Sequence, residues 1–111
     1  WFNLKSLKLN APKSKYTAIG DKFVMWCSGL TTLDLRGLST IMSIGSGFLN
    51  SCSSLKSFYA FEGAISRMSV NPAYFMNSFP KDATIYCPIG YMASYKNTQP
   101  WSNFVDQMNW C

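Results

Sequence analysis

The side chains that most often carry out catalysis are scarce in this chain. Histidine, the commonest general base and metal ligand, is absent. The acidic residues show no close pairing along the sequence; they are Asp21, Asp34, Glu62, Asp82 and Asp106. The sequence also contains no glycine-rich phosphate loop, Cys-x-x-Cys pair or nucleophile elbow. We therefore predict a protein that is not an enzyme and that holds neither a cofactor nor a metal ion.

Basic residues outnumber acidic ones. Ten Lys and Arg stand against five Asp and Glu, which gives a net charge of +5. Half of the basic residues lie in the first fifth of the chain and the others are scattered, whereas nucleic-acid-binding proteins usually concentrate them in a stripe. We interpret the charge as a solvated basic surface and expect no nucleic-acid partner. The sequence has no apolar run approaching the ~20 residues of a membrane-spanning helix.

Apolar residues recur with a period of about 25 residues, which is typical of repeat architectures. The motif L-x-x-L-x-L occurs as LKSLKL, LTTLDL and LKSFYA, and in degenerate form as PKDATI, at residues 4–9, 30–35, 55–60 and 80–85. Between these copies, IGDKFVMWCS at 19–28 is repeated as IGSGFLNSCS at 44–53.

This spacing fits a stack of parallel strands. The last two apolar positions of each motif are two residues apart, so their side chains share one face of a strand. About twenty further residues bring the chain back to the start of the next strand, as parallel pairing requires. We predict strands near 4–9, 30–35, 55–60 and 83–87, with a short helical turn or two in GDKFVMWC and GSGFLNSC.

The predicted fold class is α/β, a right-handed β/α solenoid of about three and a half coils with a parallel β-sheet. It forms a single domain over residues 1–111, with repeats at about 4–29, 30–54 and 55–79 and a terminal strand and cap at 80–111. The expected core residues are Phe23, Cys27, Leu30, Leu33, Leu35, Ile44, Phe48, Cys52 and Leu55.

The C-terminal segment has no further copy of the motif and contains several aromatic residues. We predict a short helix near 90–97 and a turn or second helix near 101–109. These place Trp101 and Phe104 over the exposed end of the last coil, since residues three apart share one side of a helical turn. A platform on which sugars or bases stack is the alternative for these aromatic residues.

The residues between the inward positions face outward and form three rows across the sheet. The expected rows are Ser6, Thr32, Ser57 and Asp82; then Lys8, Asp34, Tyr59 and Thr84; then Asn10, Arg36, Phe61 and Tyr86. Tyr and Arg are over-represented in protein-binding hot spots. The candidate protein-binding surface is therefore made of Lys8, Asp34, Arg36, Tyr59, Phe61 and Tyr86. The alternative is that loops or a neighbouring domain cover this patch.

The repeat resembles the BspA-like leucine-rich repeats found in surface proteins of anaerobic bacteria and some mucosal parasites. The family pattern, I-G-x-x-A-F-x-x-C-x-x-L-x-x-I-x-I, is matched at Ile19-Gly20, Phe23, Cys27-Ser28, Leu30, Leu33 and Leu35, and again at Ile44-Gly45, Phe48, Cys52-Ser53, Leu55 and Phe58. The alanine of the pattern is replaced by Lys22 and Gly47. The family's terminal signature is matched at Thr84-Ile85-Tyr86-Cys87-Pro88, Gly90, Tyr95, Trp101 and Phe104.

The four cysteines fall into two groups. Cys27 and Cys52 occupy equivalent inward positions of the repeat, so we predict buried thiols rather than a disulfide. Cys87 stands where the family's terminal strand usually has valine, and Cys111 ends the printed sequence. A Cys87–Cys111 disulfide and two separate thiols are both consistent with these positions.

The resemblance implies a secreted or surface-attached bacterial protein without catalytic residues. The predicted function is a non-catalytic module for protein–protein interaction or adhesion, with a host matrix protein or another bacterial surface protein as its partner. One alternative is a structural spacer or terminal domain of a larger surface protein. Another is a module that binds carbohydrate or a polyanion.

Overall fold

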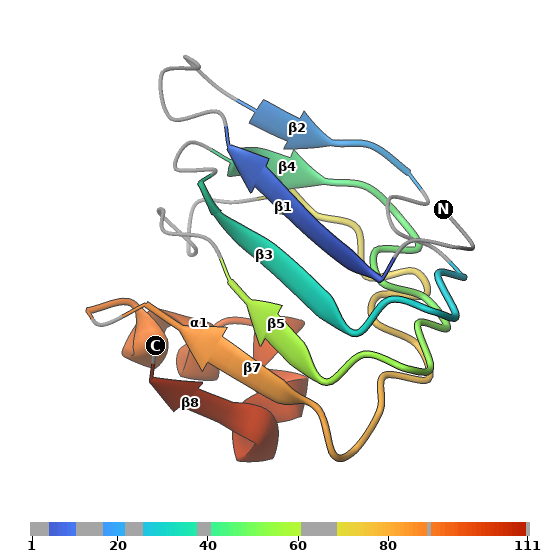
Figure 1. Ribbon diagram of the computed structural model, residues 1–111. Helices are drawn as coiled ribbons and strands as arrows, with labels where there is room; N and C mark the ends of the chain where they lie inside the picture. Colours follow the sequence, from blue (N-terminus) through green and yellow to red (C-terminus); the bar gives the residue numbers. More distant parts are fainter. Residues whose placement is uncertain are drawn as a thin grey trace.

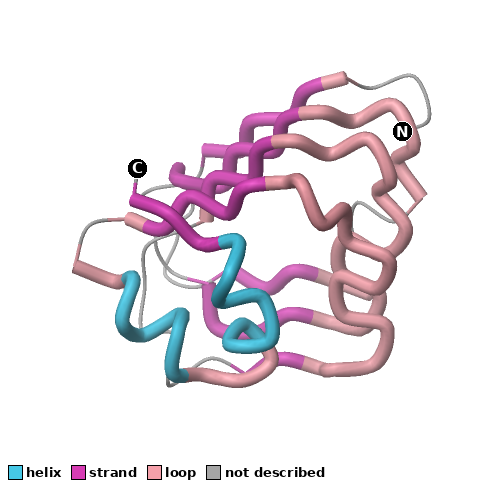
Figure 2. Tube along the Cα trace, turned by 90° about the horizontal axis from the view of Figure 1, so that it is seen from below, coloured by secondary structure: helices cyan, strands magenta, loops and turns pink. Residues whose placement is uncertain are grey.

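The computed structural model contains two parallel β-sheets, which form two separate layers. It describes residues 5–10, 17–21, 26–37, 41–60, 69–88 and 90–110. The larger sheet has the order β1-β3-β5-β7-β8, with β1 Ser6–Asn10, β3 Thr32–Gly37, β5 Ser57–Tyr59, β7 Thr84–Cys87 and β8 Met108–Trp110. The smaller sheet has the order β2-β4-β6, with β2 Thr17–Ile19, β4 Ile41–Ile44 and β6 Ser69–Val70. Figure 1 shows the strands of the larger sheet lying next to one another, and Figure 2 shows the two sheets as separate layers joined by stacked turns.

The parallel sheet that the leucine pattern predicts is confirmed. Leu7, Leu33, Phe58 and Ile85 lie opposite one another on β1, β3, β5 and β7. Their strands begin within two residues of the predicted starts, and all three pairings are parallel. Spacing along the sequence has therefore placed equivalent apolar side chains in one inward row.

The predicted register of the fourth strand is wrong. Ser57 pairs with Thr84 and Tyr59 with Tyr86, whereas the regular period would have placed Asp82 and Thr84 at these positions. The interval from Ser57 to Thr84 is two residues longer than the interval from Thr32 to Ser57. Because the side-chain direction alternates with a period of two, this shift keeps the same faces of β7 inward and outward.

Turns replace the predicted helical segment at 45–52. Residues 46–51 and 73–78 form turns in which Leu49 and Tyr74 are left-handed, with φ of 55° and 56°. Some of their N–H groups bond to the other turn: Ser51 N donates to Asn77 O at 2.8 Å, and Met76 N donates to Phe48 O at 2.6 Å. A helix would direct these donors back along its own axis. Half of the other predicted helical segment, residues 22–25 of 20–27, lies outside the described residues.

The predicted core is confirmed wherever the structure describes it. Eight of the nine expected residues are at most 2% exposed, namely Cys27, Leu30, Leu33, Leu35, Ile44, Phe48, Cys52 and Leu55. Phe23 lies outside the described residues. The space between the two sheets is therefore filled by the side chains that the repeat predicts to face inward.

The C-terminal segment covers one end of this core, as predicted. It consists of α1 (Met92–Asn97) and the 3₁₀ helix η2 (Trp101–Gln107). Trp101 is fully buried and its ring meets those of Phe75, Tyr95 and Phe48 at centroid distances of 4.9, 5.1 and 6.2 Å. Phe104 is half-buried and contacts Phe75 and Phe79. These contacts assign the aromatic residues to packing and not to an open platform.

Gly45 is required by a close backbone approach. A Cβ atom on Gly45 would overlap Asp21 Oδ1 and lie 2.7 Å from Asp21 N and 2.8 Å from the carbonyl carbon of Gly20. Asp21 Oδ1 also accepts a hydrogen bond from Ser46 N at 2.9 Å. We expect Gly45→Ala to lower the free energy of unfolding by about 1–3 kcal/mol in urea titrations, because the turn must shift.

Gly20→Ala is the matched control for this substitution. A Cβ atom at Gly20 meets no other atom within 4 Å. We expect the free energy of unfolding to change by less than about 1 kcal/mol. Equal losses in the two variants would show that the contact with Asp21 does not set the requirement for glycine.

Candidate functional site

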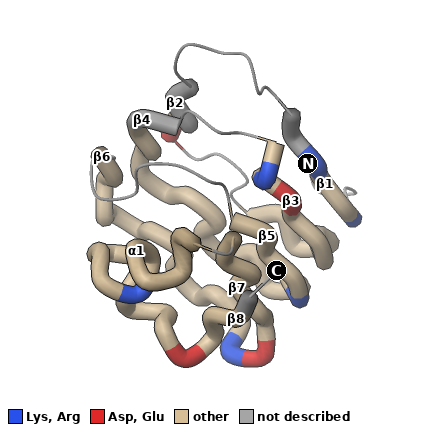
Figure 3. Tube along the Cα trace, turned by 90° about the vertical axis from the view of Figure 1, so that its left-hand side faces the viewer, with Lys and Arg blue, Asp and Glu red and all other residues tan. Residues whose placement is uncertain are grey.

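The predicted surface residues lie on the outward face of the larger sheet. Lys8, Asp34, Tyr59 and Tyr86 form one row across β1, β3, β5 and β7. Arg36 lies two residues beyond Asp34 on β3, and Figure 3 shows this acidic and basic pair next to each other on that strand. Phe61 lies outside the described residues. We call Asp34, Arg36, Tyr59 and Tyr86 the Arg–Tyr patch.

Asp34 holds the guanidinium group of Arg36 in a two-pronged ion pair. Arg36 Nε donates to Asp34 Oδ1 at 3.0 Å and Arg36 Nη2 donates to Asp34 Oδ2 at 2.7 Å. The backbone N–H of Arg36 also donates to Asp34 Oδ1 at 3.0 Å. These hydrogen bonds from Arg36 lower the pKa of Asp34 below its ordinary value, although its burial opposes them. The side chain of Arg36 is therefore fixed in direction before any partner arrives.

Tyr59 is enclosed between two other members of the patch. The guanidinium carbon of Arg36 lies 4.3 Å from the Tyr59 ring centroid. The Tyr86 ring stacks on Tyr59 at 4.7 Å between centroids and 14° between planes. Because β3 and β7 flank β5 on opposite sides, Arg36 and Tyr86 cover opposite faces of the Tyr59 ring. Tyr59 and Tyr86 are both half-buried, and their rings form a short stack across the sheet.

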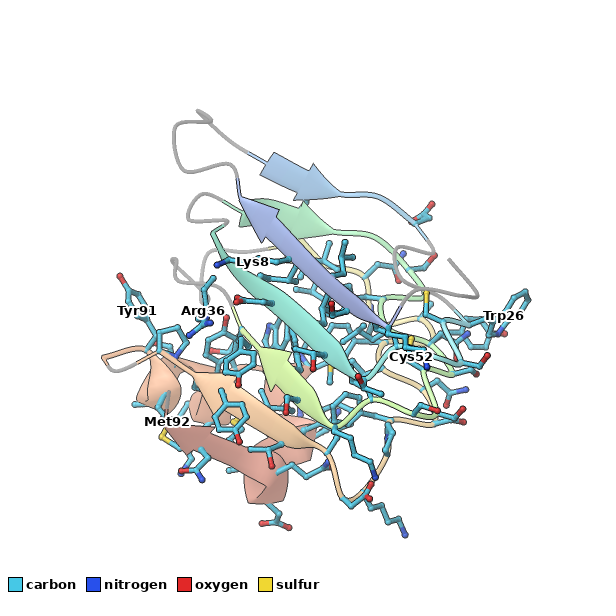
Figure 4. All side chains as sticks on the ribbon, viewed as in Figure 1. Lys8, Trp26, Arg36, Cys52, Tyr91 and Met92 are labelled. Carbon is cyan, nitrogen blue, oxygen red and sulfur yellow. The ribbon has the colours of Figure 1, made fainter. Side chains whose placement is uncertain are left out.

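Lys8 lies at one end of the row and is exposed. It is the cross-strand neighbour of Asp34, as predicted, and its charge is a minor cause of the lowered pKa of Asp34. The ion pair of Asp34 is formed with Arg36 instead of with Lys8. Figure 4 shows Lys8 and Arg36 at the same end of the sheet, far from Trp26 on the turns.

Three further features of this face differ from the predicted rows. Asn10 pairs with Gly37 and not with Arg36, because the register shifts between Lys8 and Asn10. Ser6, Thr32, Ser57 and Thr84 form a row of hydroxyl side chains, in which Thr84 replaces the expected Asp82. Asn109, on β8, extends the Lys8 row beyond Tyr86 and is exposed. The sequence did not predict Asn109 because β8 has no leucine motif; the only signal is the apolar alternation of Met108 and Trp110.

The three cysteines that the structure describes are buried. Cys27 and Cys52 are fully buried thiols, as predicted, and burial raises the pKa of both, that of Cys52 to about 11. A buried thiol with a raised pKa is a poor nucleophile. Cys87 is also buried, and Cys111 lies outside the described residues, so a Cys87–Cys111 disulfide and two separate thiols both stay alternatives. Among the described residues, no three Cys, Asp or Glu side chains gather as a metal site would require.

Alkaline pH is expected to destabilise the protein through Cys52. Its pKa is about 11 in the folded protein against an ordinary value of 9.0, so the folded state retains a proton that the unfolded state loses. The protonated thiol of Cys52 makes its full contribution to the free energy of unfolding below about pH 9. As the pH rises to about 11 this contribution is lost, and the free energy of unfolding falls by about 2–3 kcal/mol. Urea unfolding across this range, compared with Cys52→Ala, should show a shallower decline in the variant. Equal slopes would contradict the prediction.

Comparison of the chain with protein-family models, with curated proteins and with solved structures found no match. None of the described helices combines the length and the apolar character needed to cross a lipid bilayer.

Proposed function

We propose that this protein is a non-catalytic protein-binding module, built on a right-handed leucine-rich-repeat solenoid of the BspA-like type. We further propose that it acts at the bacterial surface or as a secreted protein, with a host matrix protein or another bacterial surface protein as its partner. The motif matches support the family, and the parallel pairing of strands about 25 residues apart agrees with a solenoid of about three and a half coils. Right-handedness follows from the crossover rule for parallel strands.

The Arg–Tyr patch is the observation that carries the proposed binding function. Arg and Tyr are, together with Trp, the residue types enriched in binding hot spots. Here Asp34 fixes Arg36, and Arg36 and Tyr86 hold Tyr59 between them. Side chains ordered before binding lose little conformational entropy when a partner arrives. The covered faces of Tyr59 leave no room for a sugar ring to stack on that side chain.

A pull-down of host matrix proteins and bacterial surface proteins tests this proposal. The full chain serves as bait, and the double variant Tyr59→Ser/Tyr86→Ser removes the stacked rings. Tyr74→Ser is the matched control, since Tyr74 is 68% exposed but lies in the turns between the sheets. We expect a partner that is captured by the wild type and the control and lost with the double variant. Equal capture by all three baits would overturn the proposed site.

A further inference from the structure

The outward face of the larger sheet carries its charge at one end. Lys8 lies on β1, and Asp34 and Arg36 lie on β3. The outward positions that the structure describes on β5, β7 and β8 are all uncharged; they are Ser57, Tyr59, Thr84, Tyr86 and Asn109. The charged end of this face therefore lies over β1 and β3. The neutral end lies over β5, β7 and β8 and is rich in hydroxyl groups.

The charge of that end is positive. Asp34 is 7% exposed and its two oxygens are bound by Arg36, so the pair is close to neutral as seen from outside. Lys8 is exposed, and among the described outward positions of this sheet it carries the charge that no ion pair balances. The ion pair of Lys56 and Asp82, at 2.9 Å, brings no surplus charge to the neutral end. A partner with carboxylates over β1 and β3 therefore complements this face.

The neutral end is better suited to a polypeptide than to a nucleobase or sugar that binds by stacking. Arg36 and Tyr86 occupy the two faces of Tyr59, so the stack turns ring edges and hydroxyl groups toward solvent. Such groups make hydrogen bonds with peptide groups and apolar contacts with side chains. A nucleobase or sugar needs an open ring face, and Tyr59 offers none.

We propose that the outward face of the larger sheet binds an acidic protein segment lying across the strands. Its carboxylates lie over Lys8 at the β1 end, and its uncharged part lies over Tyr59 and Tyr86. This inference rests on the proposed function and adds the chemistry and the orientation of the partner.

Selection of short random peptides displayed on phage, with the full chain as the target, tests the inference. The enriched peptides are then titrated by fluorescence polarisation against the wild type, Lys8→Glu and Tyr59→Ser/Tyr86→Ser. Lys96→Glu on α1 is the matched charge reversal, because Lys96 is exposed but belongs to the cap. We expect the enriched peptides to contain Asp or Glu and to lose about tenfold or more in affinity with Lys8→Glu. Lys96→Glu should bind like the wild type, and binding should weaken as salt rises.

The outcomes separate the two proposals. Peptides that require the tyrosines but lack acidic residues, or that bind Lys8→Glu like the wild type, would overturn the acidic partner and leave the proposed function standing. A selection that enriches no peptide dependent on Tyr59 and Tyr86 would overturn both proposals. Binding to a glycan array that is lost in the double tyrosine variant would replace the protein partner with a carbohydrate.

Discussion

Truncation of the chain after Ser94 is expected to unfold the protein or to make it aggregate. The removed segment contains Tyr95 and Trp101, which are both fully buried, and the whole of β8. It also contains Gln107, whose side-chain amide donates to the carbonyl groups of Pro80 and Ala83 at 2.8 and 2.9 Å. Thermal unfolding by circular dichroism and size-exclusion chromatography measure the effect. A truncated protein that stayed monomeric with an unchanged Tm would show that the segment is an appended tail.

A single substitution in the same segment tests whether the packing of Trp101, and not only the presence of the segment, stabilises the protein. Trp101→Ala removes the indole between Phe48, Phe75 and Tyr95 and should lower the free energy of unfolding by about 3–5 kcal/mol. Val105→Ala is the control in the same 3₁₀ helix, because Val105 is 39% exposed. Its cost should stay near that of other exposed positions, within about 0.5 kcal/mol.

Leu33→Ala is expected to lower the free energy of unfolding by about 2–5 kcal/mol. Leu33 has no exposed surface and lies between Leu7 and Phe58 on the neighbouring strands, so its loss leaves a cavity that the adjacent strands cannot fill without moving. Thr32→Ala, on the outward face of the same strand, should cost less than about 1 kcal/mol. Urea titration of both variants checks the difference. A loss below about 0.5 kcal/mol for Leu33→Ala would contradict its assigned role in the core.

The sequence predicts the strands and the core well because these depend on periodicity. Leu33 and Leu35 face inward for the same reason that Phe58 and Ala60 do: each pair is two residues apart on a strand that repeats. The cap was also predictable. A stack of strands that stops repeating leaves an apolar end, and bulky residues such as Trp101 cover such ends efficiently.

The features that the sequence did not predict depend on loop length and backbone geometry. The register of Tyr86 depends on the two additional residues between β5 and β7. No single residue in that segment indicates where the additional length is accommodated. The turns at 46–51 require left-handed Leu49 and Ser51, which are not residue types that signal this conformation. The stacking of Tyr59 on Tyr86, and hence the form of the Arg–Tyr patch, follows from that register. The candidate residues were therefore predictable, and their arrangement was not.

The order of strands in the larger sheet has a mechanical consequence. The first described strand of the chain, β1, lies at one edge of the sheet, and the last, β8, lies at the opposite edge, as Figure 1 shows. Tension applied between the two ends of the chain therefore pulls the outer strands away from the sheet. Because each strand of this sheet pairs only with its neighbours in that order, an outer strand can detach while the inner strands stay paired.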